Sequence, residues 1–466
     1  MIHATRSFSA DDQRWFGRVS GDLNPLHMDP QWAEATFPGA PVVHGAHALL
    51  WGLDAHIAHA GASRVHGVRA TFLKPIIVGD EAQVASATDG SGFTVLVRGA
   101  SMLVARLHDA AREDRVAIGD AMAAGPGAQA RARTLASLSN LTGRIGLPVA
   151  ADELSRAFPN VSRAAGAHAA SGLAAVSALV GMECPGLHSL LAELSVSFVA
   201  PPADSLAFRV RKVERAFSRV EIDVNGFGIT GSVGAFAGRD EREPPSDDAL
   251  RAMVSGDEFA GQQPLIVGAS GGLGAVTARL LQAGGAQPIV TWHRTRPAAD
   301  PADRGGSTLR AVQLDAADPA AGLAALAQAG WQGAHVYYFA SPRIFRRRLE
   351  TYQSADLRDF LRVYVDGFHE LVRGLLQLRA GAPLSVFYPS SVALDESRPE
   401  LLEYALAKRA GEDLCERLQQ AHKGLTIVVR RLPRVHTRQT MTFLNVKAEA
   451  PEQVMAPIVR LLQGWP

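Results

Sequence analysis

Two groups of residues in this sequence have the types and the spacing to do chemistry. Near the amino end, Asp22 and His27 stand five residues apart in the stretch SGDLNPLHMD, residues 20–29. A carboxylate and an imidazole that converge on a small volume can divide general-base and general-acid work on one water molecule. This pair therefore predicts addition or removal of water.

The second group lies near the carboxyl end and consists of Ser391, Tyr404 and Lys408. Residues four apart share one face of a helix, so Lys408 is expected beside the phenol of Tyr404 and to lower its pKa. Ser391 would bind a substrate carbonyl that Tyr404 protonates. A Tyr-x-x-x-Lys pair alone is weak evidence, because such pairs often only pack along a helix.

The segment around Asp22 and His27 is predicted to be an irregular loop rather than one helix face. Ser-Gly and Asn-Pro are turn signals, and the residue before a proline is pushed out of the α region. Loops held by a rigid scaffold commonly carry catalytic groups. On spacing alone, the alternative is that Asp22 caps a turn and His27 is an ordinary loop residue.

The longer pattern Ser-Gly-Asp-x-Asn-Pro-x-His-x-Asp, followed by VVHG at residues 42–45, resembles the signature of the MaoC-like (R)-specific enoyl-thioester hydratases and dehydratases. The resemblance implies a hot-dog fold, in which a curved antiparallel sheet wraps a central helix. It also implies that Asp22 and His27 are the catalytic pair and that Asn24 orients them. The helix that opens near Gly45 would offer backbone amides to the thioester carbonyl.

The elements expected around this loop suit such a unit. Residues 7–20 read as a short strand and a helix with Ser9 as its cap, and residues 44–60 as a buried helix. Strand-like runs then follow at 63–72, 81–87 and 93–106. We assign residues 1–125 to this first hot-dog unit.

An internal repeat extends the prediction to residue 240. Phe72 and Pro75 are matched by Phe198 and Pro201 at an offset of 126 residues, and a valine at 84 by one at 210. An Ala-rich helix at 167–182 precedes strands at 192–199, 206–213 and 219–224. Residues 126–240 therefore read as a second, structural hot-dog half that lacks the Asp-His string, although so few matches could also arise by chance.

A different domain is predicted after a charged, Pro-containing linker at residues 241–263. Residues 264–267 form a strand, GASGGLG (268–274) a glycine turn, and 275–282 the start of a helix. Gly268 permits the tight turn, Gly272 a close approach to a pyrophosphate, and Gly274 close packing of helix on strand.

The next strand, residues 287–292, ends in His293 and Arg294 rather than in an acidic residue. A cation there can pair with a 2′-phosphate, so the sequence favours NADPH over NADH, although Arg294 would equally suit a solvated surface. Further strands are expected at 309–314, ending in Asp315, and at 334–340 and 384–391.

With the serine, tyrosine and lysine, this pattern resembles the short-chain dehydrogenase/reductase family over residues 264 to about 445. The resemblance implies a doubly wound Rossmann sheet and catalytic roles for Ser391, Tyr404 and Lys408. The chain departs from the family pattern at residues 339–341, which read FAS instead of Asn-Ala-Gly, and at Asp366, where an asparagine is usual. The cofactor-binding residues expected from the turn and the resemblance are Gly268, Ser270, Gly272, Leu273, Gly274, His293, Arg294, Asp315, Ala340 and Thr437.

The composition narrows the class of protein. A chain of 466 residues is too long for one core, and 47 basic against 46 acidic residues give no support for nucleic-acid or membrane binding. The two cysteines do not form a metal-ligand or disulfide pattern, so no metal is expected. Neither a signal peptide nor an apolar run of about 18 residues is evident. We therefore expect a cytoplasmic protein.

The two predicted activities share one compound class. A MaoC-like site interconverts trans-2-enoyl and (R)-3-hydroxyacyl thioesters, and a short-chain reductase site interconverts 3-oxoacyl and 3-hydroxyacyl groups. The sequence thus predicts a bifunctional enzyme of fatty-acid or polyketide type that acts on acyl-CoA or acyl carrier protein thioesters, as a homodimer through its reductase part. The alternatives are a hydratase with a non-catalytic Rossmann domain, and a non-catalytic scaffold.

Overall fold

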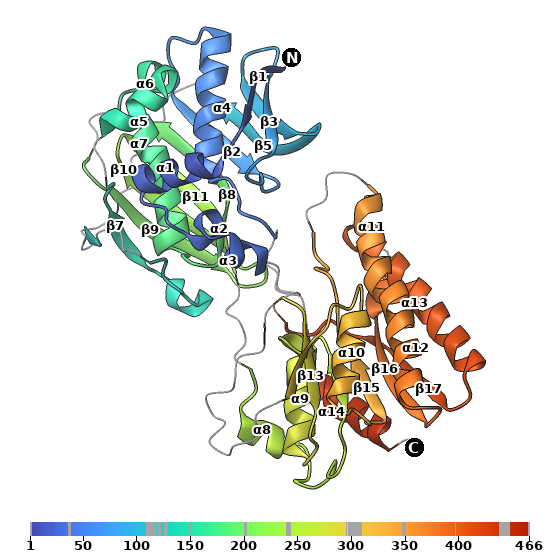
Figure 1. The fold of residues 1–466 in the computed structure, drawn as a ribbon. Helices are drawn as coiled ribbons and strands as arrows, with labels where there is room; N and C mark the ends of the chain where they lie inside the picture. Colours follow the sequence, from blue (N-terminus) through green and yellow to red (C-terminus); the bar gives the residue numbers. More distant parts are fainter. Residues whose placement is uncertain are drawn as a thin grey trace. The chain divides into compact units, whose positions relative to one another are not determined.

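The structure is a computed structural model that describes residues 2–35, 39–108, 118, 123–124, 129–148, 151–199, 203–238, 244–294, 296, 310–346, 351–396, 398–437 and 448–464. The chain forms two compact units (Figure 1). The first consists mainly of residues 1–240, and the second of residues 241–440 and 447–466.

The first unit is built on one sheet, in which the described residues supply eleven strands in the order β1-β3-β4-β5-β2-β8-β11-β10-β9-β7-β6. All pairs are antiparallel except β6 with β7. The strands are β1 (Ile2–Ser7), β2 (Gly67–Phe72), β3 (Glu81–Ser86), β4 (Gly92–Val97), β5 (Ala100–Leu107), β6 (Ala123–Ala124), β7 (Thr142–Ile145), β8 (Ser189–Phe198), β9 (Leu206–Glu214), β10 (Arg219–Gly226) and β11 (Ile229–Ala237).

This sheet consists of two halves with the same order of elements. In the first half, α4 (Gly45–Ala60) precedes β2, and in the second α7 (Ala169–Ala178) precedes β8. Phe72 and Phe198 end these two corresponding strands, and the valines at the next repeat positions lie in β3 and β9. The halves join where β2 pairs with β8, and the double hot-dog assignment stays a prediction.

Small side chains let α7 pack closely against its surroundings. All ten of its residues are buried, and Gly172 has no room for a Cβ atom because Ile229 lies within 2.6 Å of where that atom would be. The helix continues as a π-helical turn, η2 (Leu179–Glu183). The predicted helix at 167–182 therefore exists, and it brings Ser177 and Gly181 to the loop that carries Asp22.

Two local predictions differ from the structure. The single strand expected at 93–106 is a hairpin of β4 and β5, because Arg98 and Gly99 adopt positive φ angles of 48° and 77°, as a two-residue turn requires. The strand β11 was not predicted. By contrast, Ser9 caps α1 (Ala10–Ser20) as expected, with a capping box formed with Asp12.

The second unit contains a parallel sheet with the order β14-β13-β12-β15-β16-β17. Neighbouring residues of one strand face opposite cores: Leu265 and Val267 pack on one face, and Ile266 on the other. Helices cover both faces, as the doubly wound prediction requires (Figure 1). The strands are β12 (Leu265–Val267), β13 (Ile289–Trp292), β14 (Arg310–Gln313), β15 (His335–Tyr338), β16 (Leu384–Ser391) and β17 (Leu425–Leu432).

The helices of this unit include a pair that carries most of the candidate site. The segment α9 (Gly272–Ala283) follows β12, and α13 (Leu402–Ala421) follows β16. The remaining longer helices are α10 (Ala320–Gln328), α11 (Ser354–Leu361), α12 (Phe368–Leu378) and α14 (Pro451–Gln463), and the π-helical segment η3 (Arg362–Gly367) joins α11 to α12.

The predicted linker at 241–263 is partly wrong. Within it, α8 (Asp247–Arg251) forms, and Leu250, Val254 and Phe259 are buried in one core of the second unit. Charge and proline content suggested a free segment, but these three apolar residues find a surface on α9 and α14. The described part of the predicted linker therefore belongs to the second unit.

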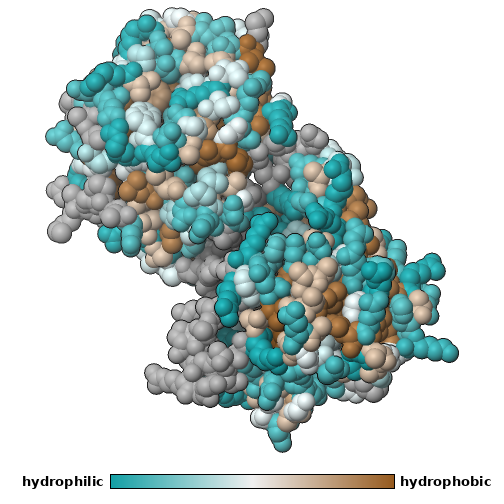
Figure 2. Space-filling model, in the orientation of Figure 1, coloured by the Kyte–Doolittle hydropathy of each residue, from teal (hydrophilic) through white to brown (hydrophobic). Residues whose placement is uncertain are grey.

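No single helix among the described residues has both the length and the apolar character to cross a membrane. The helices Pro159–Ala165 and Ala169–Glu183 pass that test only together, and they are bent by 112°. Most residues of Ala169–Glu183 are buried, and buried core helices of many proteins pass the same test of length and apolar character. Figure 2 shows mostly hydrophilic residues on the visible face of both units.

Candidate active sites

The local sequence places Asp22 and His27 on different elements. Helix α1 ends with Gly21 at a left-handed φ of 80°, and Asp22 follows in the loop. Asn24, kept out of the α region before Pro25, accepts the Leu26 N–H with its side chain at 3.0 Å and so caps the short helix α2 (Pro25–Met28). His27 therefore lies on one helical turn rather than in the irregular loop that was predicted.

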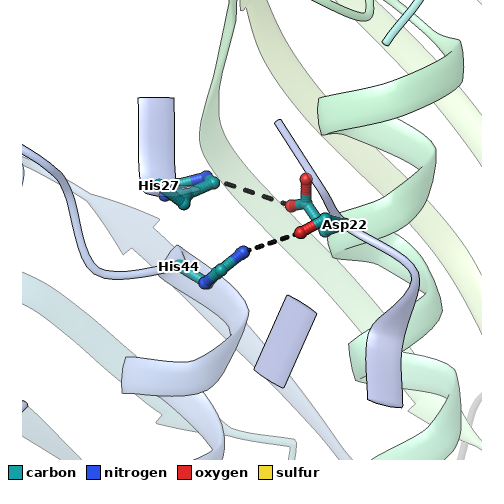
Figure 3. Close-up of side chains that lie close together, drawn as sticks. All are labelled: Asp22, His27 and His44. Atoms are coloured by element: carbon teal, nitrogen blue, oxygen red, sulfur yellow. Dashed lines mark hydrogen bonds and ion pairs between the residues drawn. The ribbon is translucent and has the colours of Figure 1, made fainter. Parts of the chain in front are cut away.

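The structure brings the two predicted catalytic residues together (Figure 3). His27 Nε2 lies 3.9 Å from Asp22 Oδ2, and both side chains are largely buried. The other ring nitrogen, Nδ1, is 2.7 Å from the Val42 carbonyl, so Nδ1 carries a hydrogen in this arrangement. A separation of 3.9 Å exceeds a direct hydrogen bond, so a water or hydroxyl oxygen can bond to both groups.

Ser177 is a member of this site that the sequence did not reveal. Its Oγ, on α7 in the other half of the sheet, donates a 2.6 Å hydrogen bond to Asp22 Oδ2, and the Asn24 N–H donates to Oδ1 at 3.2 Å. Burial raises the pKa of Asp22, while His27 and these two donors oppose that rise. Close contact is also built in at Gly181, where a Cβ atom would lie 2.3 Å from Asp22 Oδ1.

The side chain of Asn24 ties the loop to the second half rather than orienting the pair directly. Its Nδ2 donates to the Gly181 carbonyl at 2.7 Å and to the Leu187 carbonyl at 3.2 Å. Gly45 opens α4 as predicted, and a Cβ atom there would lie 3.1 Å from the ring of Phe72. Whether its backbone amide binds a thioester carbonyl stays a prediction.

A third side chain, His44, lies beside the pair. Its ring stacks on that of His27 with 3.9 Å between centroids, and its Nε2 is 3.0 Å from the Asp22 carbonyl oxygen (Figure 3). Ligand atoms of Asp22, His27 and His44 lie within 4.8 Å of one another, a spacing that a metal ion can use. Ser177 and the Asp22 carbonyl already occupy two of these groups, so we assign no metal.

The glycine turn of the second unit is tightly packed at Gly268 and Gly274, where a side chain would not fit. Gly268 has φ +84°, and a Cβ atom there would lie 2.7 Å from the Ala340 nitrogen. At Gly274 a Cβ atom would lie 2.3 Å from the Gly268 carbonyl, and Gly272, at φ +57°, lies against Thr437. The structure thus gathers Ala340 and Thr437 at the turn, next to the exposed start of α9. The first N–H groups of a helix have no partner within the helix, which suits a phosphate.

Of the other expected cofactor residues, Ser270 is exposed in the turn and Leu273 lies in the first turn of α9. His293 follows β13 and places Nε2 3.5 Å from Asp315 Oδ2, which follows β14. Arg294 is exposed. The ends of β13 and β14 therefore carry polar groups, and binding of a ligand by them stays a prediction.

The predicted serine and tyrosine of the reductase site also meet. Tyr404 on α13 is buried, and the Ser391 side chain at the end of β16 is close enough to lower the Tyr404 pKa. The predicted lowering of the Tyr404 pKa is not found: burial raises that pKa to about 12, and the Ser391 side chain only partly opposes the rise. Lys408 does not lower it, because its ammonium is directed elsewhere.

Lys408 lies inside a cluster of tyrosine rings. Its Nζ donates to the Pro389 carbonyl at 2.7 Å and lies 3.8 Å from the ring centroid of Tyr364, against 5.9 Å from that of Tyr404. Burial lowers the pKa of Lys408 to about 7. The lysine is therefore held by a main-chain carbonyl and by cation–π contacts.

Tyr364 is the second residue that sequence reasoning missed. It lies in η3 and is fully buried, with its hydroxyl hydrogen-bonded to Ser341 and its ring against Tyr404. Asp366, the residue singled out for this helix, is exposed. The π-helical turn changes which residues of η3 face the sheet, and no spacing rule for a regular helix predicts that change.

Comparisons with known proteins agree with this division. Residues 2–98 match the model of the MaoC like domain, and residues 264–460 that of the NAD dependent epimerase/dehydratase family. An (R)-specific enoyl-CoA hydratase of Aeromonas caviae is 35% identical over 79 residues, which are 16% of this chain and 59% of that protein. The amino-terminal unit thus contains a MaoC-like domain, and the match spans less than two thirds of this relative.

Solved structures of short-chain dehydrogenases are similar to part of the chain. One from Shigella flexneri, complexed with NADP, is 19% identical and covers 45% of this chain and 93% of its own, with a TM-score of 0.40. One from Pseudomonas syringae is 24% identical and covers 45% and 92%, with a TM-score of 0.38.

Proposed function

We propose that this protein is a bifunctional acyl-thioester enzyme. In this proposal the first unit is a double hot-dog hydratase or dehydratase, with the catalytic half in residues 1–125 and a supporting half in 126–240. The second unit is an NADPH-dependent 3-oxoacyl reductase. The observation that carries the proposal is the Asp22–His27 pair, buried, 3.9 Å apart and held by partners outside the pair.

In the hydratase direction, Asp22 and His27 bind one water between them and act on C2 and C3 of an enoyl thioester. The Val42 carbonyl fixes the His27 ring so that Nε2 faces this water, and Ser177 fixes the Asp22 carboxylate. One of the two takes a proton from water as hydroxide adds to C3, and the other gives a proton to C2. The Gly45 amide at the start of α4 is the candidate donor to the thioester oxygen.

In the reductase, the glycine turn, Ala340 and Thr437 would hold the dinucleotide, and Arg294 would favour a 2′-phosphate. A bound nicotinamide would supply hydride. The chain's own contribution is proton donation: Ser391 binds the substrate carbonyl, and the Tyr404 hydroxyl gives it a proton. The matching family is described as NAD dependent, and one similar solved structure contains NADP, which supports a nicotinamide cofactor.

The two steps fit one sequence of reactions. Reduction of a 3-oxoacyl thioester yields a 3-hydroxyacyl thioester, which the first unit would dehydrate. The thioester substrate is supported by the name of the Aeromonas relative, an enoyl-CoA hydratase. The acyl carrier, CoA or a carrier protein, and a homodimer through the second unit remain predictions.

A second candidate function is hydratase activity alone, with a nucleotide-binding but inactive Rossmann unit. The observation that favours it is the placement of Lys408, whose ammonium is bonded to Pro389 and enclosed by the rings of Tyr364 and Tyr388. In this arrangement the lysine does not assist the Tyr404 hydroxyl.

The test measures NADPH oxidation with a short 3-oxoacyl thioester and, separately, hydration of an enoyl thioester. We expect Tyr404→Phe to abolish NADPH oxidation and to leave hydration unchanged, whereas Tyr352→Phe, at an exposed tyrosine, changes neither. Wild-type protein that hydrates the enoyl thioester but consumes no NADPH would refute the reductase and leave the second candidate.

A further inference from the structure

The buried residues behind the hydratase pair include two that the proposed chemistry does not use, Gln13 and His44. Gln13 lies on α1 and His44 is the residue before α4, and both are almost completely buried. Gln13 Oε1 accepts the His44 backbone N–H at 3.1 Å and lies 2.9 Å from His44 Nδ1. Gln13 Nε2 faces the Ser9 carbonyl at 3.4 Å, so the orientation of the amide is fixed by two partners.

This fixed amide leaves His44 between two acceptors. Nδ1 faces Gln13 Oε1, and Nε2 faces the Asp22 carbonyl oxygen at 3.0 Å. A neutral imidazole has a single N–H, so only one of these contacts can be a hydrogen bond, whereas an imidazolium satisfies both. Burial and the neighbouring His27 and His47 oppose the charged form of His44. Together they hold the pKa of His44 well below its usual range.

We propose that Gln13 and His44 are positioning residues of the hydratase site: Gln13 fixes the ring of His44, and His44 supports His27 by stacking and Asp22 through its main chain. This inference rests on the proposed hydratase function. Because the rings of His27 and His44 are 3.9 Å apart, a charge on His44 also disfavours a proton on His27.

The ionisable groups that face His44 among the described residues are few. Asp22 and His27 lie on the loop and α2, and His47 follows on α4. The contact from α1, besides Gln13, is the ring of Phe16. Substituting Gln13 therefore changes the electrostatics of His44 without touching the reacting pair.

Two variants test the inference through different readouts. Gln13→Glu keeps the shape of the side chain and places a negative charge next to His44 Nδ1. We therefore expect His44 to hold two protons in this variant. The acid limb of kcat/KM for enoyl-thioester hydration should then move to lower pH by roughly one unit, whether the base is Asp22 or His27. Gln13→Leu removes the acceptor, and kcat should fall about 10-fold to 100-fold with a smaller change in KM.

The control is His56→Gln. His56 is a buried histidine on α4, the helix that follows His44, and its ring is hydrogen-bonded to the Ser86 hydroxyl and the Gly90 carbonyl, away from the pair. It should leave the pH profile in place even where it lowers stability. Ring 15N NMR signals, assigned with His44→Gln, should show one protonated nitrogen on His44 in the wild type at pH 7 and two in Gln13→Glu.

An unchanged acid limb in Gln13→Glu, together with unchanged His44 ring signals, would overturn the inference. A wild-type protein that hydrates no enoyl thioester would instead refute the proposed function. In that case the ring signals alone decide whether Gln13 controls the protonation of His44.

Discussion

The two candidate sites hold their ionisable groups in opposite ways. In the first unit, the Asp22 carboxylate has hydrogen-bond donors from Ser177 and Asn24. In the second, the Lys408 ammonium donates to the Pro389 carbonyl and faces aromatic rings. Both sites match a sequence pattern, although the second departs from it at residues 339–341 and 366. Polar partners support charge in the first site, whereas burial among rings disfavours it in the second.

The largest test of this contrast is Asp22→Asn. The amide keeps the shape but loses the charge, and we expect enoyl-thioester hydration to fall by about 1,000-fold while NADPH oxidation is unchanged. Steady-state rates of both reactions on one protein preparation measure this. The control is Asp29→Asn, since Asp29 is exposed and only caps the next helical turn. Equal losses in both activities would instead point to a folding defect.

A smaller loss is expected when the carboxylate loses one donor. Ser177→Ala should lower kcat for hydration about 10-fold, and it should move the acid limb to higher pH if Asp22 is the base. The reason is that burial raises the Asp22 pKa and Ser177 opposes that rise. The pH profile of hydration gives both readouts.

Ser171→Ala is a matched control for Ser177→Ala. Ser171 is buried on the same helix, and its hydroxyl has no hydrogen-bond partner among the described residues. It should leave the pH profile of hydration in place. A shift of the same size in both variants would show that the Ser177–Asp22 bond is unimportant.

The predicted cofactor preference is expected to depend on Arg294 more weakly, because this side chain is exposed. Arg294→Gln should weaken NADPH binding by roughly 10-fold and leave NADH binding unchanged, since the guanidinium would pair only with the 2′-phosphate. Fluorescence titration with both nucleotides measures the ratio. An equal loss for both would contradict the assignment of Arg294.

The remaining test concerns stability, at Lys408. Burial lowers its pKa from 10.5 to about 7, so between these pH values the unfolded chain binds the additional proton. The contribution of Lys408 to the free energy of unfolding therefore increases as pH rises through this window and is lowest below pH 7. The thermal midpoint of the wild type should therefore increase more between pH 7 and pH 9.5 than the thermal midpoint of Lys408→Met. Parallel pH dependence in both proteins would show that Lys408 is not buried as described.

Much of the fold followed from sequence because its signals are local. Ser9 caps α1, strand-like runs mark most strands of the first unit, and the glycines at 268, 272 and 274 occur where a strand turns into a helix. The hairpin at Arg98 was missed because arginine rarely adopts a positive φ and gives no turn signal.

The sites were predictable only in part. Asp22 and His27 are near each other in sequence, so their pattern identified them, and the structure places them together. Ser177 lies 155 residues from Asp22, in a helix of small residues that looks like ordinary core. Tyr364 was missed because a π-helical turn sets its direction. Contacts of this kind depend on tertiary packing, which no local pattern encodes.

The hydrogen bond between Ser177 and Asp22 also has a consequence for how activity depends on concentration. A fragment that ended at residue 125 would keep the acid and the imidazole but lose the serine donor and the carbonyl partners of Asn24. In the intact chain these groups are covalently linked, so dilution cannot separate them. Specific hydratase activity should therefore stay constant on dilution, even under conditions that dissociate any oligomer.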